Sequence, residues 1–227
     1  TNVIGTWNVI RASIDNNVQR VTFISSDKAS SPINCYGKSK ALAESLVIAS
    51  GSYAPHSKFF ATRYGNVLGS NGSVLPVLLD QVKSDGPFTI TDPEMTRYWI
   101  SLPQATEFVV KCLNEARGGE VFIPKLKSSS MLNIASAIDP NKEIKIIGKR
   151  AGEKKHEQLF SYEEFSRMYD IDWAYYVEPE FPFWNRSWKP YGRLANETSD
   201  IIWGASNTTK GLSIEELHTL ITEFEHG

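Results

Sequence analysis

The chain has 227 residues, of which 41% are hydrophobic and 22% are charged, and its formal net charge is −2. This composition is ordinary for a globular protein, and the small net charge offers no general attraction for nucleic acid or an anionic membrane. No apolar run approaches the length that spans a bilayer, and two cysteines are too few for a disulfide framework. We therefore expect a cytoplasmic protein that binds neither nucleic acid nor membrane.

The first part of the chain alternates between helix and strand patterns. Apolar residues at helical spacing predict a helix over residues 3–14, and the β-branched stretch RVTFIS predicts a buried strand at 20–25. A second helix is predicted over 36–50 and a second strand, KFFATRYG, over 58–65. This alternation is typical of a parallel sheet flanked by helices, so the predicted fold class is α/β.

Beyond Gly65 the elements are shorter and less regular. The sequence predicts helices near 74–83, 103–117 and 131–138, strands at 88–91, 120–124 and 143–148, and a closing helix at 212–224. Ser213 followed by Glu216 is a capping-box pattern that begins this last helix. The aromatic and proline-bearing segment 162–191 shows neither periodicity and is predicted to be an irregular covering segment.

Three familiar binding motifs are incomplete in this chain. CYGKS resembles the end of a phosphate-binding P-loop, but Pro32 stands where the motif needs a glycine. HEQLF begins like a zinc-protease helix and lacks the second histidine, and no other ligand spacing predicts a metal site. The glycines that follow residue 64 do not have the Gly-x-Gly-x-x-Gly spacing of a dinucleotide site.

A tyrosine and a lysine stand four residues apart in the opening stretch SSDKASSPINCYGKSK. On a helix Tyr36 and Lys40 project from the same face, and an ammonium beside a phenol stabilises the phenolate. Such a tyrosine exchanges a proton with an alcohol or a carbonyl near neutral pH. The same spacing is common on solvated helix faces, so the pair alone does not decide the function.

The polar residues before this pair extend the same pattern. Ser25 or Ser26, at the end of the predicted strand, would share the hydrogen bond of the tyrosine. Asp27 and Lys28 add an acid and a base at the strand terminus, where open α/β sheets bind their ligands. The alternative is that Lys28 merely neutralises Asp27 at a turn, since surface ion pairs are common and weak.

Together with TRYGNVLGSNGSVLP, ITDPEMTRYWIS and GEKKHE, this stretch resembles the extended short-chain dehydrogenase/reductases. Within them the chain most resembles the inverting UDP-N-acetylglucosamine 4,6-dehydratases that serve pseudaminic acid and related capsule-sugar pathways. The resemblance runs from residue 1 to about 160 and reappears in LSIEEL. It implies part of a Rossmann-like doubly wound parallel sheet and a smaller α/β subdomain that binds substrate.

The resemblance also implies a role for each catalytic residue. Tyr36 would take the proton of the sugar 4-hydroxyl while hydride leaves C4, with Ser26 orienting that hydroxyl and Lys40 holding the nicotinamide ribose. The 4-ketone would acidify C5, whose proton Lys28 would remove while Asp27 protonates the departing 6-hydroxyl. Hydride return to C6 and protonation of the opposite face of C5 would give an inverted UDP-4-keto-6-deoxy-amino sugar.

Further positions are implied to bind cofactor or substrate. Tyr64 would lie beside the nicotinamide, Asn66 and Arg97 would bind the diphosphate, and Val74 would lie near the uracil. Arg150 and Glu153 would hold diphosphate and ribose hydroxyls. Taken alone, either arginine is as well explained by a structural ion pair. The expected cofactor is NADP, with NAD as the alternative, and the expected substrate is UDP-N-acetylglucosamine or a related UDP-sugar.

Two other functions remain open from the sequence. Retaining dehydratases typically carry Asp-Glu where this chain has Asp27 and Lys28, so the pair favours the inverting reaction over a retaining dehydratase or a UDP-sugar 4-epimerase. A non-catalytic nucleotide-binding module is the third reading, although a pure binder needs no such acid–base set.

Family members begin with a Gly-rich βα turn and further strands that have no counterpart here. We therefore expect a fragment, inactive by itself, of an enzyme that is a homo-oligomer at full length. The expected domains are the remainder of an NAD(P)-binding Rossmann domain (1–72), a mainly UDP-sugar-binding part (73–160) and a C-terminal extension (161–227).

Overall fold

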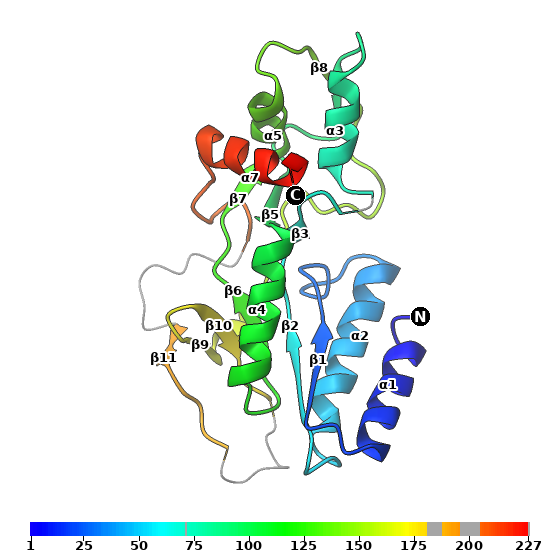
Figure 1. Ribbon diagram of the computed structural model, residues 1–227, viewed down its shortest axis with the longest axis vertical. Helices are drawn as coiled ribbons and strands as arrows, with labels where there is room; N and C mark the ends of the chain where they lie inside the picture. The colour runs from blue at the N-terminus through cyan, green and yellow to red at the C-terminus, as the bar shows by residue number, and fades with distance from the viewer. Residues whose placement is uncertain (71, 181–187, 196–204, 227) are drawn as a thin grey trace. The chain divides into compact units, whose positions relative to one another are not determined.

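The computed structural model describes residues 1–70, 72–180, 188–195 and 205–226, and these form two compact units (Figure 1). Unit 1 comprises Thr1–Tyr64, Thr106–Lys125 and Gln158–Gly204, and unit 2 comprises Gly65–Ala105, Leu126–Glu157 and Ala205–Gly227. Each unit thus gathers three separate stretches of chain. The functional division of the sequence into cofactor, substrate and C-terminal parts stays a prediction.

Unit 1 is built on a six-stranded sheet with the strand order β1-β2-β6-β10-β9-β11. The strands are β1 (Arg20–Ile24), β2 (Lys58–Thr62), β6 (Val121–Pro124), β9 (Met168–Asp170), β10 (Ala174–Val177) and β11 (Arg193–Leu194). The first three run parallel, with Phe23 opposite Ala61 and Thr62 opposite Phe122, and the other three are antiparallel. The predicted α/β class with a parallel sheet is confirmed.

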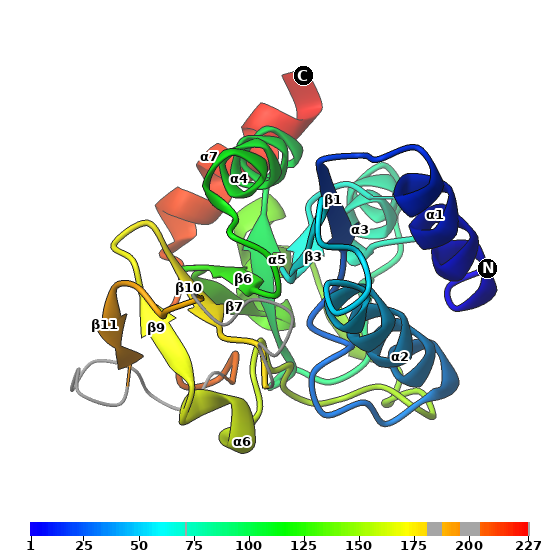
Figure 2. The same cartoon turned by 90° about the horizontal axis from the view of Figure 1, so that it is seen from below.

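Helices cover both faces of the parallel strands (Figures 1 and 2). Helices α1 (Ile4–Asp15) and α2 (Cys35–Ser50) pack against Phe59 of β2, and α4 (Leu102–Glu115) packs through Phe108 against Phe60. Phe59 and Phe60 are neighbours in one strand, and because strand side chains alternate, each fills a different core. A doubly covered sheet explains why KFFAT is apolar at consecutive positions.

The segment predicted to be irregular contains regular structure, so that prediction was wrong. It holds α6 (Tyr162–Phe165) as well as β9 and β10, and β10 pairs antiparallel with β6. The strand forms because Tyr176, fully buried, stacks on Tyr169 and contacts Phe122. Residues 181–187 of the predicted segment lie outside the described residues.

Unit 2 contains a three-stranded and a two-stranded sheet with three helices. The elements are β3 (Asn66–Val67), β5 (Thr96–Ile100) and β7 (Ser128–Ser130); β4 (Phe88–Ile90) and β8 (Ile144–Ile146); and α3 (Val74–Val82), α5 (Met131–Ile138) and α7 (Ile214–His226). One core joins the helices to β4 and β5 through buried Leu, Ile, Phe, Met and Trp side chains. The Ser213–Glu216 capping box that was predicted for α7 is present.

The other predicted helices and strands are confirmed within a few residues at their ends. Strands β3, β5 and β7 were not predicted. Among the described residues, no helix is both long enough and apolar enough to cross a bilayer.

Candidate active site

The candidate site begins where β1 and β2 end. The backbone N–H of Ser25 donates to the carbonyl of Thr62 at 2.7 Å, and that of Asp27 donates to the carbonyl of Tyr64 at 3.1 Å. The segments that follow β1 and β2 therefore stay side by side beyond the ends of the two strands. This backbone pairing brings Tyr64 next to the Ser26–Lys28 segment at the carboxyl end of the sheet, where ligands of open α/β sheets bind.

Asp27 is fully buried and belongs to a small polar network. Its Oδ1 accepts hydrogen bonds from Ser26 Oγ and from Lys28 Nζ, both at 2.9 Å, and the Lys28 side chain is 35% exposed. Its other oxygen, Oδ2, is buried and has no hydrogen-bond partner within the described chain. An unpaired buried carboxylate oxygen is costly, so Oδ2 is suited to accept a hydrogen bond from a ligand hydroxyl.

Helix α2 approaches this network closely through its first turn. Asn34 caps the helix by accepting the N–H of Gly37 at 2.8 Å, which puts Tyr36 in the first turn with about half of its surface exposed. A Cβ at Gly37 would lie far inside the normal contact distance from the carbonyl oxygen of Lys28. Glycine is therefore required for the turn that carries Tyr36 to lie against the Asp27–Lys28 backbone.

Lys40 lies one turn further along α2, and its side chain contacts strand β1. Its Nζ donates to the carbonyl of Ile24 at 2.6 Å and lies 4.4 Å from the centre of the Phe23 ring. Burial lowers the pKa of Lys40, and the negative charge of Glu44 opposes that effect. The hydrogen bond goes to a backbone carbonyl, and the predicted action of Lys40 on the Tyr36 phenol stays a prediction.

Tyr64 follows β2 and is half-buried against the aromatic core of unit 1. Burial raises the pKa of its phenol, which keeps it in the neutral form. Unit 1 thus brings together Ser26, Asp27 and Lys28 directly, and adds Tyr64 through backbone pairing.

Arg97 of unit 2 lies on β5 and is almost completely buried. Its guanidinium donates to the carbonyls of Lys154 and Lys155 at 3.0 and 3.2 Å, and to its neighbour Thr96 at 2.7 Å. It therefore fastens the loop 148–156 to β5. This contact is neither the phosphate contact that the resemblance implies nor the ion pair of the alternative.

Arg150 and Glu153 lie in that same loop. The Glu153 carboxylate accepts the backbone N–H of Arg150 at 3.0 Å, while the carbonyl of Arg150 accepts the N–H of Glu153 at 3.2 Å. Arg150 is exposed, and Arg97 binds the carbonyls of Lys154 and Lys155, which follow the Arg150–Glu153 turn. The backbone at Arg150 is therefore held by hydrogen bonds, and the binding of a diphosphate by its side chain stays a prediction.

The two remaining predicted residues of unit 2 lie at the start of β3 and of α3. Asn66 is opposite Trp99 in the β3–β5 ladder, and its Oδ1 is buried without a hydrogen-bond partner among the described residues. Val74 is the first residue of α3 and packs on the core of unit 2. An unpaired side-chain oxygen at Asn66 is consistent with a ligand there.

Sequence reasoning missed a buried charge cluster in unit 1. Arg63, 2% exposed by its side chain, forms ion pairs with Glu44 of α2 and Glu164 of α6. Nothing in the local sequence indicates that Glu44, one helical turn after Lys40, pairs with Arg63. The other partner, Glu164, is 101 residues away from Arg63. Such a pairing is invisible in a single sequence.

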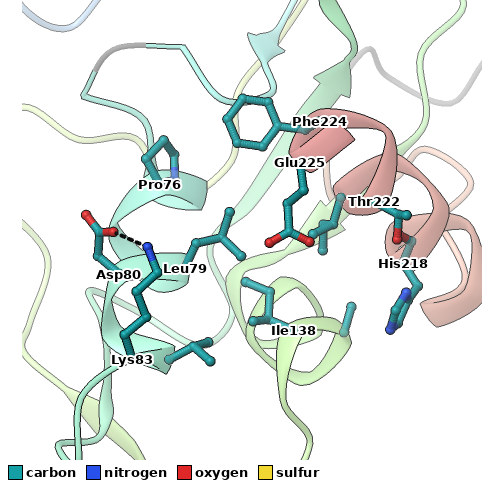
Figure 3. A pocket seen from close by; sticks show the side chains of 12 residues that line it. Pro76, Leu79, Asp80, Lys83, Ile138, His218, Thr222, Phe224 and Glu225 are labelled. Atoms are coloured by element: carbon teal, nitrogen blue, oxygen red, sulfur yellow. Dashed lines mark hydrogen bonds and ion pairs between the residues drawn. The ribbon is translucent and has the colours of Figure 1, made fainter. Parts of the chain in front are cut away.

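A separate hollow of about 410 Å³ lies in unit 2 between α3, α5 and α7 (Figure 3). Its floor is apolar, with Leu79 and Ile138, and its rim carries His218 and the exposed Asp80–Lys83 ion pair. None of the predicted site residues lines it. The residues predicted to carry the chemistry therefore lie outside this hollow.

Residues 1–179 match the family described as polysaccharide biosynthesis protein. The chain belongs to this family. The match runs beyond residue 160, where the resemblance was predicted to end, and together with the relatives below it confirms that resemblance.

Relatives in this family differ in the reaction for which they are named. A UDP-N-acetylglucosamine 4,6-dehydratase (inverting) from Campylobacter jejuni is 42% identical over 184 residues, covering 79% of this chain and 54% of the relative. A UDP-glucose 4-epimerase from Rickettsia felis is 34% identical over 242 residues, covering all of this chain and 68% of the relative. The chain thus spans about half to two-thirds of the length of these curated relatives.

A solved structure supports the fold across almost the whole chain. The X-ray structure of Pen from Bacillus thuringiensis has a TM-score of 0.84 and 32% identity, covering 98% of this chain and 68% of that one. The Rossmann-like fold of the extended short-chain dehydrogenase/reductases is therefore established for this protein.

Proposed function

We propose that this protein functions as a nucleotide-sugar 4,6-dehydratase that acts on UDP-N-acetylglucosamine and inverts C5. The observation that carries the proposal is the Ser26–Asp27–Lys28 network against the first turn of α2. The higher identity to the inverting dehydratase than to the epimerase supports the same reading.

The Asp27–Lys28 pair is suited to an elimination. At rest the pair is a carboxylate 2.9 Å from an ammonium. Movement of one proton along that contact converts it into a carboxylic acid beside a neutral amine, which is the acid–base couple that loss of water requires. The amine then removes the C5 proton, and the acid protonates the 6-hydroxyl so that it leaves as water.

Tyr36 and Ser26 are suited to the preceding step at C4. Tyr36 accepts the proton of the 4-hydroxyl, while the Ser26 hydroxyl, already bonded to Asp27, orients the sugar oxygen. The resulting 4-ketone makes the C5 proton acidic. After water has left, a proton added to the opposite face of C5 sets the inverted configuration.

The residues of unit 1 fit a nicotinamide cofactor, for which NADP is proposed with NAD as the alternative. Lys40 has three N–H groups and uses one of them for the carbonyl of Ile24, so others remain for ribose hydroxyls. Tyr64 beside Asp27 offers a neutral ring to the nicotinamide. When bound, the cofactor supplies the hydride acceptor and donor that oxidation at C4 and reduction at C6 need.

Unit 2 is proposed to bind the UDP part of the substrate. Asn66, with its unpaired buried oxygen, and Arg150, on its secured turn, are the polar groups that support this assignment. Arg97 is proposed to contribute to diphosphate binding mainly indirectly, because it holds the loop that carries Arg150.

The main alternative is a UDP-sugar 4-epimerase, because the relative with that name covers the whole chain. An epimerase needs the Tyr36–Lys40 chemistry at C4 but no acid–base pair for C5 and C6. The buried Asp27 with its Lys28 partner therefore favours the dehydratase.

Product analysis separates these reactions. The protein, at the full length that its gene encodes, is incubated with UDP-N-acetylglucosamine and NADP or NAD, and the nucleotide sugar is examined by mass spectrometry. We expect a product lighter by one water. A product of unchanged mass with the configuration at C4 inverted would refute the dehydratase and establish the epimerase.

A further inference from the structure

The buried charge cluster of unit 1 lies directly behind the helix that carries the proposed catalytic tyrosine and lysine. Arg63 is the residue after β2, Glu44 lies in the middle of α2, and Glu164 belongs to the short helix α6. The side chains of Arg63, Glu44 and Glu164 are 2%, 9% and 17% exposed. The cluster thus ties α2 and α6 to the end of a central strand of the sheet.

The hydrogen bonds use the whole guanidinium. Arg63 binds Glu44 through Nη2 and through Nε, the latter at 3.2 Å, and it binds both oxygens of Glu164 at 2.9 Å. Its Nη1 also donates to the carbonyl of Leu159 at 2.9 Å. Two bidentate pairs on one arginine fix the orientation of both carboxylates, which a single-point contact would not do.

Glu44 binds Arg63 and lies on the same helix as Lys40. It stands four residues after Lys40, so the two side chains project from the same helix face. Among the described residues, the contacts of Lys40 with strand β1 are the Phe23 ring and the carbonyl of Ile24, neither of which titrates. Helix α1 packs on α2 through apolar side chains, and Asn2, which precedes α1, donates a neutral hydrogen bond to Ser39 of α2.

From this arrangement we infer that Glu44 is a positioning residue: Arg63 holds its carboxylate on the face of α2 that carries Lys40, and the carboxylate keeps the Lys40 side chain in place at the end of β1. The inference rests on the proposed role of Lys40 in the reaction. The new element is that the protonation and position of Lys40 depend on the buried Arg63–Glu44 pair, one helical turn away, which touches neither substrate nor cofactor.

The electrostatics give this inference a direction. Burial lowers the pKa of Lys40, and the Glu44 carboxylate raises it again. Removal of the Glu44 charge leaves the burial effect unopposed, so Lys40 loses its proton at a lower pH. The ammonium is the form that binds ribose hydroxyls and stabilises a phenolate, so activity on the alkaline side falls earlier.

The chain provides a matched control for the test. Glu44→Gln and Glu164→Gln each remove one negative charge that Arg63 binds through two hydrogen bonds. Glu44 stands four residues after Lys40 on α2, whereas Glu164 lies on a different helix, α6. A purely structural cluster would give the two variants the same behaviour.

The experiment measures the titration of the Lys40 side chain by NMR in the protein at its full encoded length, without substrate. We expect the midpoint in Glu44→Gln to move to lower pH, and the midpoint in Glu164→Gln to stay with the unchanged protein. Equal midpoints in all three proteins would overturn the inference. Should Glu44→Gln not fold, Glu44→Asp, which withdraws the charge by one methylene, is measured with the same expected direction and the same refuting result.

A second readout keeps this test separate from that of the proposed function. With UDP-N-acetylglucosamine and cofactor, the alkaline limb of the pH–rate profile should move to lower pH in Glu44→Gln and not in Glu164→Gln. A shifted titration without any turnover would refute the proposed function and leave the role of Glu44 standing. A profile unmoved despite a shifted titration would refute the part of the inference that concerns activity.

Discussion

At the scale of single residues, the account depends on Asp27 and Lys28. Asp27 has one oxygen bonded to Ser26 and Lys28 and one buried oxygen without a partner in the described chain. A buried carboxylate that served only stability would be expected to have both oxygens bonded. The half-satisfied carboxylate is therefore better explained by a part in chemistry.

The first prediction at this scale concerns the base. Lys28→Ala should lower the rate of dehydration by about 10²–10⁴-fold, the range that general acid–base catalysis contributes. Lys38→Ala is the control, because Lys38 carries the same charge at an exposed position of α2. Rates are measured by product formation, and thermal unfolding verifies that both variants fold. A Lys28→Ala protein that dehydrates at the rate of the Lys38→Ala protein would contradict the assignment.

The sequence predicted the site residues that lie close together in the chain, but not the long-range contacts that hold them in place. Tyr36, Lys40 and the Asp27–Lys28 pair are recognisable because they lie within one short stretch. The Arg63–Glu164 contact joins residues 101 positions apart, and the contact of Arg97 with Lys154 joins residues 57 positions apart. Long-range pairs of this kind follow from the topology of the chain and leave no periodic signal.

At the scale of elements, the close approach of α2 to the turn after β1 matters most. Its first turn is fixed by the Asn34 cap, and Gly37 lets it lie against the carbonyl of Lys28. Because this contact is with backbone, an added methyl group has no flexible side chain to displace.

Two glycine substitutions test this approach. Gly37→Ala should destabilise the protein by about 1–3 kcal/mol, as overpacking typically does, and should also impair turnover. Gly5→Ala, in α1, meets nothing within 4 Å and should stabilise the protein by roughly 0.5–1 kcal/mol, since alanine is the better helix former. Urea unfolding of both variants is the measurement. Equal effects of the two substitutions would show that the close approach at Gly37 is absent.

Elements were predicted well where periodicity was long and poorly where pairing decides the structure. The long helix predicted over 36–50 is observed at Cys35–Ser50, within one residue at each end. The strand Ser128–Ser130 consists only of serines, and it exists because it pairs with β5. Likewise β10 exists because β6 offers it an edge, so a short aromatic stretch became a strand.

At the scale of the whole molecule, the protein divides its predicted residues between two units. Unit 1 holds the acid–base groups and Lys40, and unit 2 holds Asn66, Arg97 and the loop of Arg150 and Glu153. The fold class was predictable from alternating helices and strands, whereas the interleaving of three stretches in each unit was not. It arises because β6 returns to pair with β2 after the chain has built only the first stretch of unit 2, Gly65–Ala105.

The central claim is that these residues eliminate water across C5 and C6 and protonate C5 from the opposite face. The most direct measurement is NMR of the product formed from UDP-N-acetylglucosamine in deuterated water by the protein at its full encoded length. The account predicts a 4-keto sugar with a methyl group at C6, deuterium at C5 and inverted configuration there. A product that retains its hydroxymethyl group, or that carries deuterium at C5 without inversion, would contradict it.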